Sequence, residues 1–377
     1  METPPQPEYI HSTLLVAGDA MSHGPQIKDA LACGGGESYD YRPCLQYVKP
    51  RITEADLAVV NLETVFRSGK EYVGYPSFNS PPSFAEALKD AGFDLLSTAN
   101  NHSYDQRYQG LCDTLDRLDE MGLAHVGTYR TQQEYDANLG VVVQDVGGIS
   151  VAFLDYTYGL NGYTVDPSVD FCVNRFNVDY NSDLSQLDKE KLSRELQYAQ
   201  SLDTDLIAVM IHWGVEYQLQ QNSYQEQVAD FLIAHGADLV LGGHSHTPQP
   251  LEFRSVTTED GSTRQGFVCY SLGNFLSNQQ WEYSDITALL QLQLRKDLSS
   301  GQTELVGVNY VPCLMLRREE GKTPRYYLLE AYETMELYQQ GTAPDFINAD
   351  VFQRLEKCVA DCQKIFGSQY DYQVQEG

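Results

Sequence analysis

Short apolar segments alternate with helical segments over most of this chain, and this alternation limits the fold more than any other feature. Runs rich in Val, Ile, Leu and Phe have strand length at 12–18, 57–63, 95–100, 141–146, 150–156, 206–213, 237–243 and 267–273. Apolar residues with a helical period recur between them at 83–93, 107–122, 192–202 and 225–236. Strand–helix alternation predicts βαβ units, and therefore a largely parallel sheet covered by helices.

The C-terminal part has a different pattern. Residues 288–297, 304–316 and 325–332 alternate in polarity as antiparallel strands do, and an amphipathic helix is predicted at 350–366. A chain of 377 residues is within reach of one large α/β domain with an appendage. We therefore predict one domain over 10–295, with 296–377 adding strands and a helix that pack on the same domain.

The acidic composition restricts the partners. The chain has 25 Lys and Arg against 53 Asp and Glu, a net charge of -28, which repels nucleic acid and anionic lipid. It has no apolar run long enough for a transmembrane helix. We expect no nucleic-acid partner and no membrane span, and we expect any anionic substrate to be held through bound cations.

The first residues, METPPQPEYIHS, are short and polar and do not resemble a signal peptide. We expect a location outside the cytoplasm or at the cell surface, with an export or anchor segment removed; a cytoplasmic protein is the alternative. The eight cysteines show no C-x-x-C pattern and no cationic setting, so we expect structural roles for them. Their number permits disulfides without requiring them.

Polar side chains of metal-binding type follow successive predicted strands. They are Asp19 and His23; Asn61 and Glu63; Asn100, Asn101, His102 and Asp105; His212 and Glu216; His244 and His246; and Asn274. One such residue alone is typical of a helix N-cap or a turn. Because ligands bind at the carboxyl ends of strands in open α/β sheets, we expect the set to converge. Mixed oxygen and nitrogen donors without thiolate suit Mn, Fe, Zn or Co, and two metals sharing a carboxylate commonly hydrolyse phosphate esters.

The ordered motifs GD (18–19), NLE (61–63), TANNHSYD (98–105), HWGVEY (212–217), GADLVLGGHSHTPQPLE (236–252) and YSLGNF (270–275) resemble those of the CapA family. These are bacterial proteins of capsule and poly-γ-glutamate synthesis with a calcineurin-like metallophosphatase fold. The resemblance runs from about residue 12 to about 290. It implies a four-layer α/β/β/α sandwich of the metallophosphoesterase type, here with a β-rich C-terminal part and a terminal helix.

The resemblance also implies roles for single residues. Two divalent transition metals (Mn, Fe or Zn) would be held by Asp19, Glu63, Asn101, His212, His244 and His246. Glu63 would bridge the metals, Asp19 and His246 would bind one of them, and the remaining ligands would bind the other.

The resemblance gives His102 a catalytic role, and a hydrolytic mechanism would add substrate-binding residues. His102 would protonate the leaving group, with Asp105 orienting it. We expect Glu216, Asn274, Trp213 and the long loop 160–185 to shape the substrate pocket. Three of these assignments have alternatives: Glu216 could orient a ligand histidine, Trp213 could pack in the core, and the loop 160–185 could be a flexible surface insertion.

The chain departs from the usual metallophosphoesterase motifs at two places. The first strand usually carries D-x-H, but here Met21 stands at the histidine position and the nearest histidine is His23. The second strand usually carries G-D-x-x-D, but here Glu63 must bridge, with Asn61 as its neighbour or an alternative ligand. One metal site therefore lacks a sure ligand and could be weak or empty.

These observations leave more than one function open. The first is a binuclear-metal hydrolase that uses a metal-bound hydroxide on a phosphoester or on a polymer amide bond. The alternative is a non-catalytic accessory protein that binds the anionic polymer or polymer-synthase subunits. A degenerate relative with a structural ion is the third, supported by the missing D-x-H. The acidic surface argues against unaided polyanion binding, and the proton donor His102 argues for chemistry.

Overall fold

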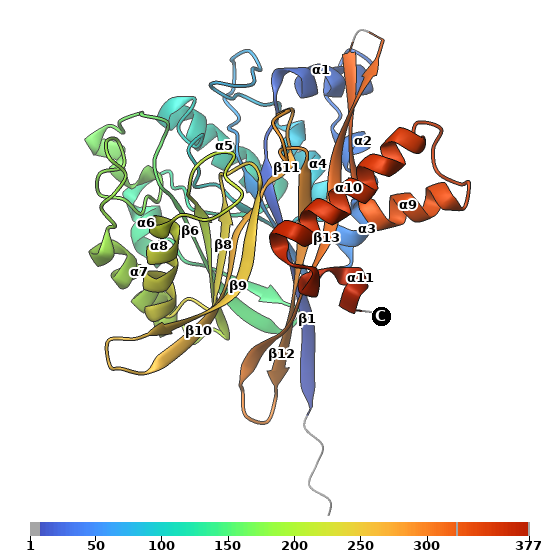
Figure 1. Cartoon of the computed structure of the whole chain (residues 1–377). Coiled ribbons are helices and arrows are strands. Elements are labelled where there is room, and N and C mark those ends of the chain that lie inside the picture. Colours follow the sequence, from blue (N-terminus) through green and yellow to red (C-terminus); the bar gives the residue numbers. More distant parts are fainter. Residues whose placement is uncertain (1–7, 322, 376–377) are drawn as a thin grey trace, which may run out of the picture.

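The computed structural model describes residues 8–321 and 323–375, and two β-sheets pack face to face at its centre (Figure 1). The first sheet has eight strands in the order β14 (Thr323–Glu330), β13 (Thr303–Glu320), β12 (Ile286–Asp297), β1 (Tyr9–Ala20), β2 (Leu57–Leu62), β3 (Leu95–Ser97) and β4 (Ala124–Val126), with β11 (Asn274–Leu276) beside β1. The second has six, in the order β5 (Val142–Val146), β6 (Ile149–Thr157), β7 (Leu206–His212), β8 (Leu239–Gly243), β10 (Thr263–Leu272) and β9 (Pro248–Thr257).

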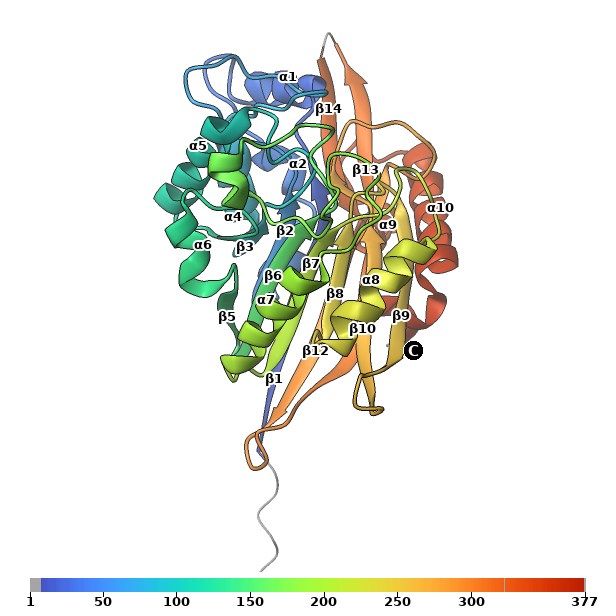
Figure 2. The ribbon, with the colours of Figure 1, turned by 90° about the vertical axis from the view of Figure 1, so that its left-hand side faces the viewer.

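Helices cover the outer faces of both sheets (Figure 2). The first sheet is covered by α1 (Gly24–Cys33), α2 (Arg42–Leu45), α3 (Lys49–Thr53) and α4 (Ser83–Ala91), and the second by α7 (Lys189–Ser201) and α8 (Ser223–Ala234). The other helical segments are α5 (Arg107–Met121), α6 (Gln132–Asn138), η1 (Pro167–Cys172), α9 (Ala331–Gln339), α10 (Ala349–Phe366), η2 (Ser368–Tyr370) and α11 (Tyr372–Gln375). The predicted four-layer α/β/β/α arrangement is confirmed.

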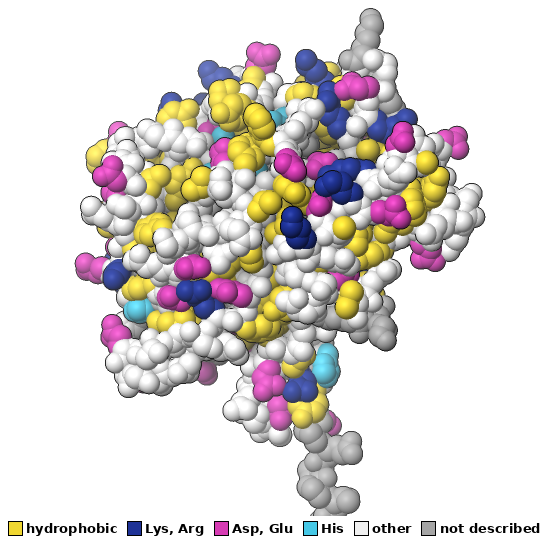
Figure 3. Space-filling model, viewed as in Figure 1, with side chains coloured by type: hydrophobic (Ala, Val, Ile, Leu, Met, Phe, Trp, Pro, Cys, Tyr) yellow, Lys and Arg dark blue, Asp and Glu magenta, His cyan; other side chains and the backbone are white. Residues whose placement is uncertain are grey.

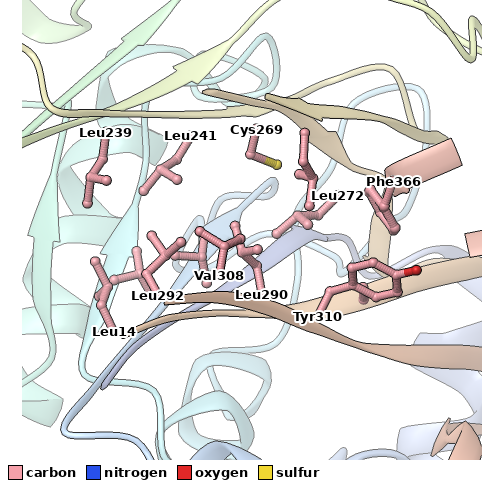
Figure 4. Packing of buried hydrophobic residues seen from close by; sticks show 14 of the residues in the cluster. Leu14, Leu239, Leu241, Cys269, Leu272, Leu290, Leu292, Val308, Tyr310 and Phe366 are labelled. Atoms are coloured by element: carbon pink, nitrogen blue, oxygen red, sulfur yellow. The ribbon is translucent and has the colours of Figure 1, made fainter. Parts of the chain in front are cut away.

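The layers follow from the two-residue period of the strands. In β1, Leu14 and Val16 belong to the core between the sheets, whereas Leu15 and Ala17 belong to the core beneath the helices. Successive side chains of a strand point to opposite faces, so a strand buried on both faces is apolar throughout. Figure 4 shows the result: Leu239 and Leu241 of the second sheet point toward the opposing side chains of the first. This packing fixes the position of the strand ends of one sheet relative to those of the other.

The sequence pattern missed some elements at the edges of the sheets. Strand β9 was not predicted, because its outer half alternates intermediate and exposed residues and it contains two prolines. It is an edge strand, where proline is tolerated and one face is solvated. Residues 141–146 form β5 as expected, but β5 runs antiparallel to β6 and forms the opposite edge of the same sheet.

The C-terminal elements continue the sandwich. Strands β13 and β14 extend the first sheet beyond β12, and α10 covers the open side of the core between the sheets. Leu355, Cys358, Cys362 and Phe366 of α10 are buried in that core. The predicted amphipathic helix at 350–366 is therefore confirmed, and residues beyond 295 contribute to the same core as the rest.

Other sequence-based expectations concern the cysteines and the membrane. All eight cysteines are free thiols, and most are buried. No helix in the described ranges is long and apolar enough to cross a membrane. Part of the polar N-terminal segment, residues 1–7, lies outside the described residues.

The position of α10 leads to a stability prediction. The ring of Phe366 is 2% exposed and lies 5.0 Å from the ring of Tyr310, centroid to centroid. Phe366→Ala is expected to lower the free energy of unfolding by about 3–5 kcal/mol, because it opens a cavity in the shared core. The control Val374→Ala removes a side chain that is 53% exposed and should change it by less than about 0.5 kcal/mol.

Urea unfolding followed by circular dichroism measures both variants. The main transition should move to lower urea in Phe366→Ala. A separate early transition of the tail, with the main transition unmoved, would show that residues 296–377 fold independently of the sandwich.

Candidate metal centre

The carboxyl ends of parallel strands from both sheets meet at one end of the sandwich. Strands β1, β2 and β3 run parallel in the first sheet, and β6, β7 and β8 run parallel in the second. Asp19 lies near the end of β1, Glu63 directly follows β2, and His212 ends β7. The loop after β3 adds Asn101, and the turn after β8 adds His244 and His246. The two sheets therefore contribute ligand-type side chains from opposite sides.

Glu63 lies at the centre of this group. It is fully buried, and neither of its carboxylate oxygens has a hydrogen-bond partner among the described residues. Its carboxylate forms one compact cluster of ligand-type atoms with His212 and His244, and a second with Asp19 and His246. A carboxylate shared by two adjacent clusters has the arrangement expected of a bridging ligand.

The ligand-type atoms of the cluster on the β7 side lie within hydrogen-bond distance or slightly beyond it. Nε2 of His212 lies 3.0 Å from Oδ1 of Asn101, 3.1 Å from Nδ1 of His244 and 3.5 Å from Oε1 of Glu63. Ligand atoms about 2.1 Å from one metal ion are about 3.0–3.5 Å apart in octahedral or tetrahedral geometry. The side chains of this cluster are all at most 4% exposed, so the geometry fits a divalent cation.

The cluster on the β1 side is built around Asp19. Its carboxylate accepts hydrogen bonds from Nδ2 of Asn61 (2.8 Å) and from the backbone N–H of His244 (2.9 Å). Oδ2 of Asp19 lies 3.7 Å from Nδ1 of His246. Asn61 therefore orients the aspartate, and its own Oδ1 accepts from Asn100. This is the neighbour role of the two that the sequence left open for Asn61.

The turn after β8 shows why the sequence reads Gly-Gly-His-Ser-His. A Cβ atom at Gly243 would lie 2.5 Å from Oδ1 of Asp19, so only glycine allows the close approach. His244 and His246 have positive φ angles of 95° and 56°, which are uncommon for residues other than glycine. Strained backbone of this kind clusters at functional sites.

Asn274 holds His246 in place. Nδ2 of Asn274 donates to the backbone carbonyl of Ser284 (3.0 Å), which fixes the orientation of the amide. Its Oδ1 lies 3.0 Å from Nδ1 of His246, so that nitrogen carries the proton and Nε2 keeps a free lone pair. Asn274 is 1% exposed. The prediction that Asn274 contacts substrate is therefore wrong, because its amide is committed to orienting a histidine.

The β1-side cluster lacks the histidine of the D-x-H motif, and another residue lies near it. Met21 is buried, and His23 belongs to no metal-type cluster within the described ranges. Glu216 instead forms a cluster with His244 and His246, and its Oε1 lies 4.0 Å from Nε2 of His246. Its side chain is 46% exposed. Glu216 can therefore reach the metal centre from the solvent side, as a ligand or as a contact to substrate.

His102 lies beside the metal clusters and is tied to Asp105. Nδ1 of His102 lies 2.7 Å from Oδ2 of Asp105, which also accepts the backbone N–H of Phe78 (2.6 Å). Burial alone would lower the pKa of His102, but the hydrogen bond and charge of Asp105, with Glu63 and Glu216, raise it above its ordinary value. The Phe78 ring packs edge-on against the imidazole, 4.7 Å between centroids. Because Asp105 accepts at Nδ1, Nε2 is the nitrogen that can exchange a proton with substrate.

Trp213 does not line this site. Its indole is 1% exposed, stacks on Tyr270 and donates its N–H to the backbone carbonyl of Tyr270 (2.9 Å). It belongs to the core between the second sheet and its helices. The prediction of a substrate contact is therefore wrong, and the core alternative holds. His11, His125 and His235 also belong to none of the metal-type clusters of the described residues.

Sequence reasoning missed two residues that follow β6. The ring of Tyr158 lies 4.6 Å from that of His244, centroid to centroid. Asn161, in the long loop 160–185, accepts from Nδ2 of Asn101 (3.1 Å), and its amide nitrogen lies 3.4 Å from Nδ1 of His102. The same rule that found the other strand ends, applied to β6, would have found both. The loop thus reaches the metal centre at its first residues.

The electrostatics of the centre depend on burial. Burial raises the pKa of Glu63 to about 8, and burial together with the charge of Glu63 raises that of Asp19 to about 6. Burial lowers the pKa of His212 to about 4 and those of His244 and His246 well below their ordinary value. The imidazoles are therefore neutral and available as ligands at pH 7. A bound cation would supply the positive charge that the buried carboxylates need in order to be ionised.

Comparison with known proteins finds a family to which the chain is similar. The model of the family described as "Bacterial capsule synthesis protein PGA_cap" matches residues 13–279. The chain is 28% identical over 314 residues to a "PGA biosynthesis protein CapA" of Bacillus subtilis, which covers 82% of this chain and 74% of that protein. It is 28% identical over 290 residues to a "Capsule biosynthesis protein CapA" of Bacillus anthracis, which covers 75% and 64%.

Among solved structures, one described as a novel phosphatase of Mycoplasma pneumoniae superposes with a TM-score of 0.42 at 14% identity. The superposition covers 81% of this chain and 95% of that chain.

The raised pKa of Glu63 leads to a prediction for chelated protein. Between its ordinary pKa of 4.5 and about 8, the unfolded state loses the proton that the folded state keeps, so rising pH destabilises the metal-free fold. Glu63→Gln removes this titration. In EDTA, the variant should gain stability over the wild type from pH 5 to pH 8, by about 1–3 kcal/mol.

Thermal melts with and without Mn²⁺ measure this effect. Added metal should raise the melting temperature of the wild type more than that of Glu63→Gln. Glu304→Gln, whose carboxylate is 59% exposed, is the matched control and should follow the wild type. A chelated wild type that gains stability over the Gln variant toward pH 8 would contradict the assignment of Glu63 as a cation ligand.

Proposed function

The chain belongs to the bacterial capsule synthesis protein family PGA_cap, and we propose that it is a metal-dependent hydrolase within capsule or poly-γ-glutamate biosynthesis. The proposed reaction is hydrolysis of a phosphoester, with the amide bond of the polymer as the other candidate bond. One observation carries the proposal. Within the described part of the chain, the buried carboxylate of Glu63 has no hydrogen-bond donor, and it is surrounded by ligand-type atoms of both sheets.

The donor set favours two transition metals over other cations. Imidazole nitrogens, an amide oxygen and carboxylates without thiolate suit Mn, Fe or Zn. Glu63 would be shared, with Asp19 and His246 on one side and His212, His244 and Asn101 on the other. Bound divalent metals would polarise the phosphoryl group and lower the pKa of the attacking water.

His102 supports a catalytic role over a purely structural ion. Its Nδ1 is held by Asp105, and Asp105 is itself buried and fixed by the backbone N–H of Phe78. This arrangement presents Nε2 as a proton donor toward a leaving oxygen. The raised pKa of His102 keeps a larger fraction protonated near neutral pH. A protein that only binds a polymer has no evident need for such a donor.

A comparison of leaving groups tests this function. The metal-loaded wild type is expected to hydrolyse both p-nitrophenyl phosphate and an alkyl phosphoester. In His102→Gln, kcat for the alkyl ester should fall by about 10²–10⁴, because an alkoxide needs the proton. The loss for p-nitrophenyl phosphate should be much smaller, since nitrophenolate leaves unaided. Asp105→Asn should show the same pattern with a smaller loss.

The matched control is His125→Gln, a histidine paired with Asp119 outside the centre. It should keep the kcat of the wild type on both substrates. Absence of hydrolysis of phosphoesters and of γ-glutamyl amides with Mn, Fe and Zn would reject the hydrolase and favour an accessory protein that binds the polymer or its synthase. Equal losses on both substrates would reject His102 as the proton donor.

A further inference from the structure

A cavity of about 550 Å³ opens beside the metal centre, and the proposed mechanism does not use it. Its lining residues are His23, Tyr75, Tyr217, Asn278, Gln279, Gln280 and Trp281. They come from the loop before α1, the loop between β2 and α4, the loop after β7 and the segment between β11 and β12. These loops all lie at the end of the sandwich that carries the metal ligands.

Aromatic rings connect the cavity to both functional parts of the centre. The ring of Tyr75 lies 6.5 Å from that of His102, centroid to centroid. The ring of Tyr217 lies 6.0 Å from that of His246 and 5.7 Å from that of Trp281. A group bound in the cavity would therefore adjoin the proton donor on one side and a metal ligand on the other.

The aromatic side chains of the cavity are unusually exposed. Tyr75 is 72% exposed and Trp281 is 65% exposed, although burial of such rings is strongly favourable. Figure 3 shows hydrophobic side chains next to histidine side chains at the upper end of the molecule. Exposed aromatic surface at the mouth of a polar site is typical of a ligand-binding surface.

Three of the polar side chains that line the cavity are amides held in place by neighbours. Gln279 accepts from Asn274 (2.9 Å), Gln280 accepts from Arg317 (3.1 Å), and Asn278 accepts from the hydroxyl of Tyr326. The amide –NH2 groups of these side chains are thereby left to donate to a ligand. Among the described residues, those that line the cavity include no Lys, Arg, Asp or Glu.

This chemistry selects against a polyanion. A chain of γ-linked glutamates carries one carboxylate per residue, whereas no Lys or Arg is among the described residues that line this cavity, in a protein of net charge -28. The cations of the adjoining cavity, Arg317, Arg354 and Lys357, are already paired with Glu319, Asp285 and Asp361. A wholly apolar ligand would leave the amide donors without partners. A sugar ring has an apolar C–H face that can lie on an aromatic ring, and hydroxyl groups that can accept from amides.

We propose that this cavity binds a saccharide ring, the alcohol part of a glycosyl phosphoester whose phosphoryl group lies at the metal centre. The assignment rests on the proposed function and names its substrate class. In the reaction, the bond between phosphorus and the sugar oxygen breaks, and the electron pair stays on that oxygen. The oxygen takes the proton of Nε2 of His102, while water supplies the oxygen that phosphorus gains and releases a proton to solvent.

Tryptophan fluorescence tests the assignment without any reaction. The chain has two tryptophans, and Trp213 is 1% exposed, so acrylamide quenching reports on Trp281. The probes are methyl β-glucoside, N-acetylglucosamine, uridine and tri-γ-glutamate, each with the EDTA-treated full chain. Both sugars should protect Trp281 from acrylamide in a saturable way, and uridine and tri-γ-glutamate should not.

Variants add a second measurement. Tyr75→Ala should weaken sugar binding about tenfold, since one aromatic contact contributes about 1–1.5 kcal/mol. The matched control is Phe253→Ala, which removes an aromatic ring 44% exposed on β9, and its sugar affinity should equal that of the wild type.

Each result has one meaning. Protection by sugars alone, weakened in Tyr75→Ala, supports the proposal. Protection by uridine would assign a nucleoside instead, and protection by tri-γ-glutamate would assign the polymer. Either result, with or without protection by the sugars, would overturn the saccharide. Absence of protection by every probe would overturn it as well. Because these measurements need neither metal nor turnover, sugar binding without any hydrolysis would reject only the proposed function.

Discussion

A carboxylate that is buried without a hydrogen-bond donor costs several kcal/mol, and the architecture of this site depends on offsetting that cost. Glu63 could have been satisfied by one lysine or arginine. The chain instead surrounds it with Asp19, Asn101 and the imidazoles of His212, His244 and His246, whose lowered pKa values leave these three rings neutral at pH 7. In the metal-free fold a proton takes this role, because burial raises the pKa of Glu63 to about 8, and a bound cation would take the place of that proton. The favourable free energy of core packing therefore offsets the cost of burying the Glu63 carboxylate.

Several residues near the centre do not point at substrate or metal, yet they determine its geometry. Asn61 orients Asp19, Asn274 orients His246, and Asp105 orients His102. Asp155 accepts the backbone N–H groups of Thr98 and Ala99, at the start of the loop that carries Asn101. These hydrogen bonds hold side chains of both sheets before any ligand arrives, which is the condition for strong metal binding and for efficient catalysis.

The sequence predicted the layers and most of the metal-type residues, because both depend on local patterns. Apolar runs identify buried strands, and polar residues at their ends identify the functional edge of a parallel sheet. It did not predict what long-range packing decides. Trp213 follows His212 directly, yet Trp213 packs in the core between the second sheet and its helices, whereas His212 belongs to a metal-type cluster. Asn274 resembled a substrate contact until the carbonyl of Ser284 showed which way its amide faces.

The division of ligands between the sheets also affects how fast the protein is degraded. Asp19 and Glu63 come from one sheet, and His212, His244 and His246 come from the other, so any bound ion ties the two halves of the sandwich together. An ion at about a thousandfold excess over its dissociation constant adds about 4 kcal/mol to the folded state. When the metal is scarce, more of the protein would be unfolded and open to proteases. The amount of this protein would then follow the supply of the ion in its surroundings.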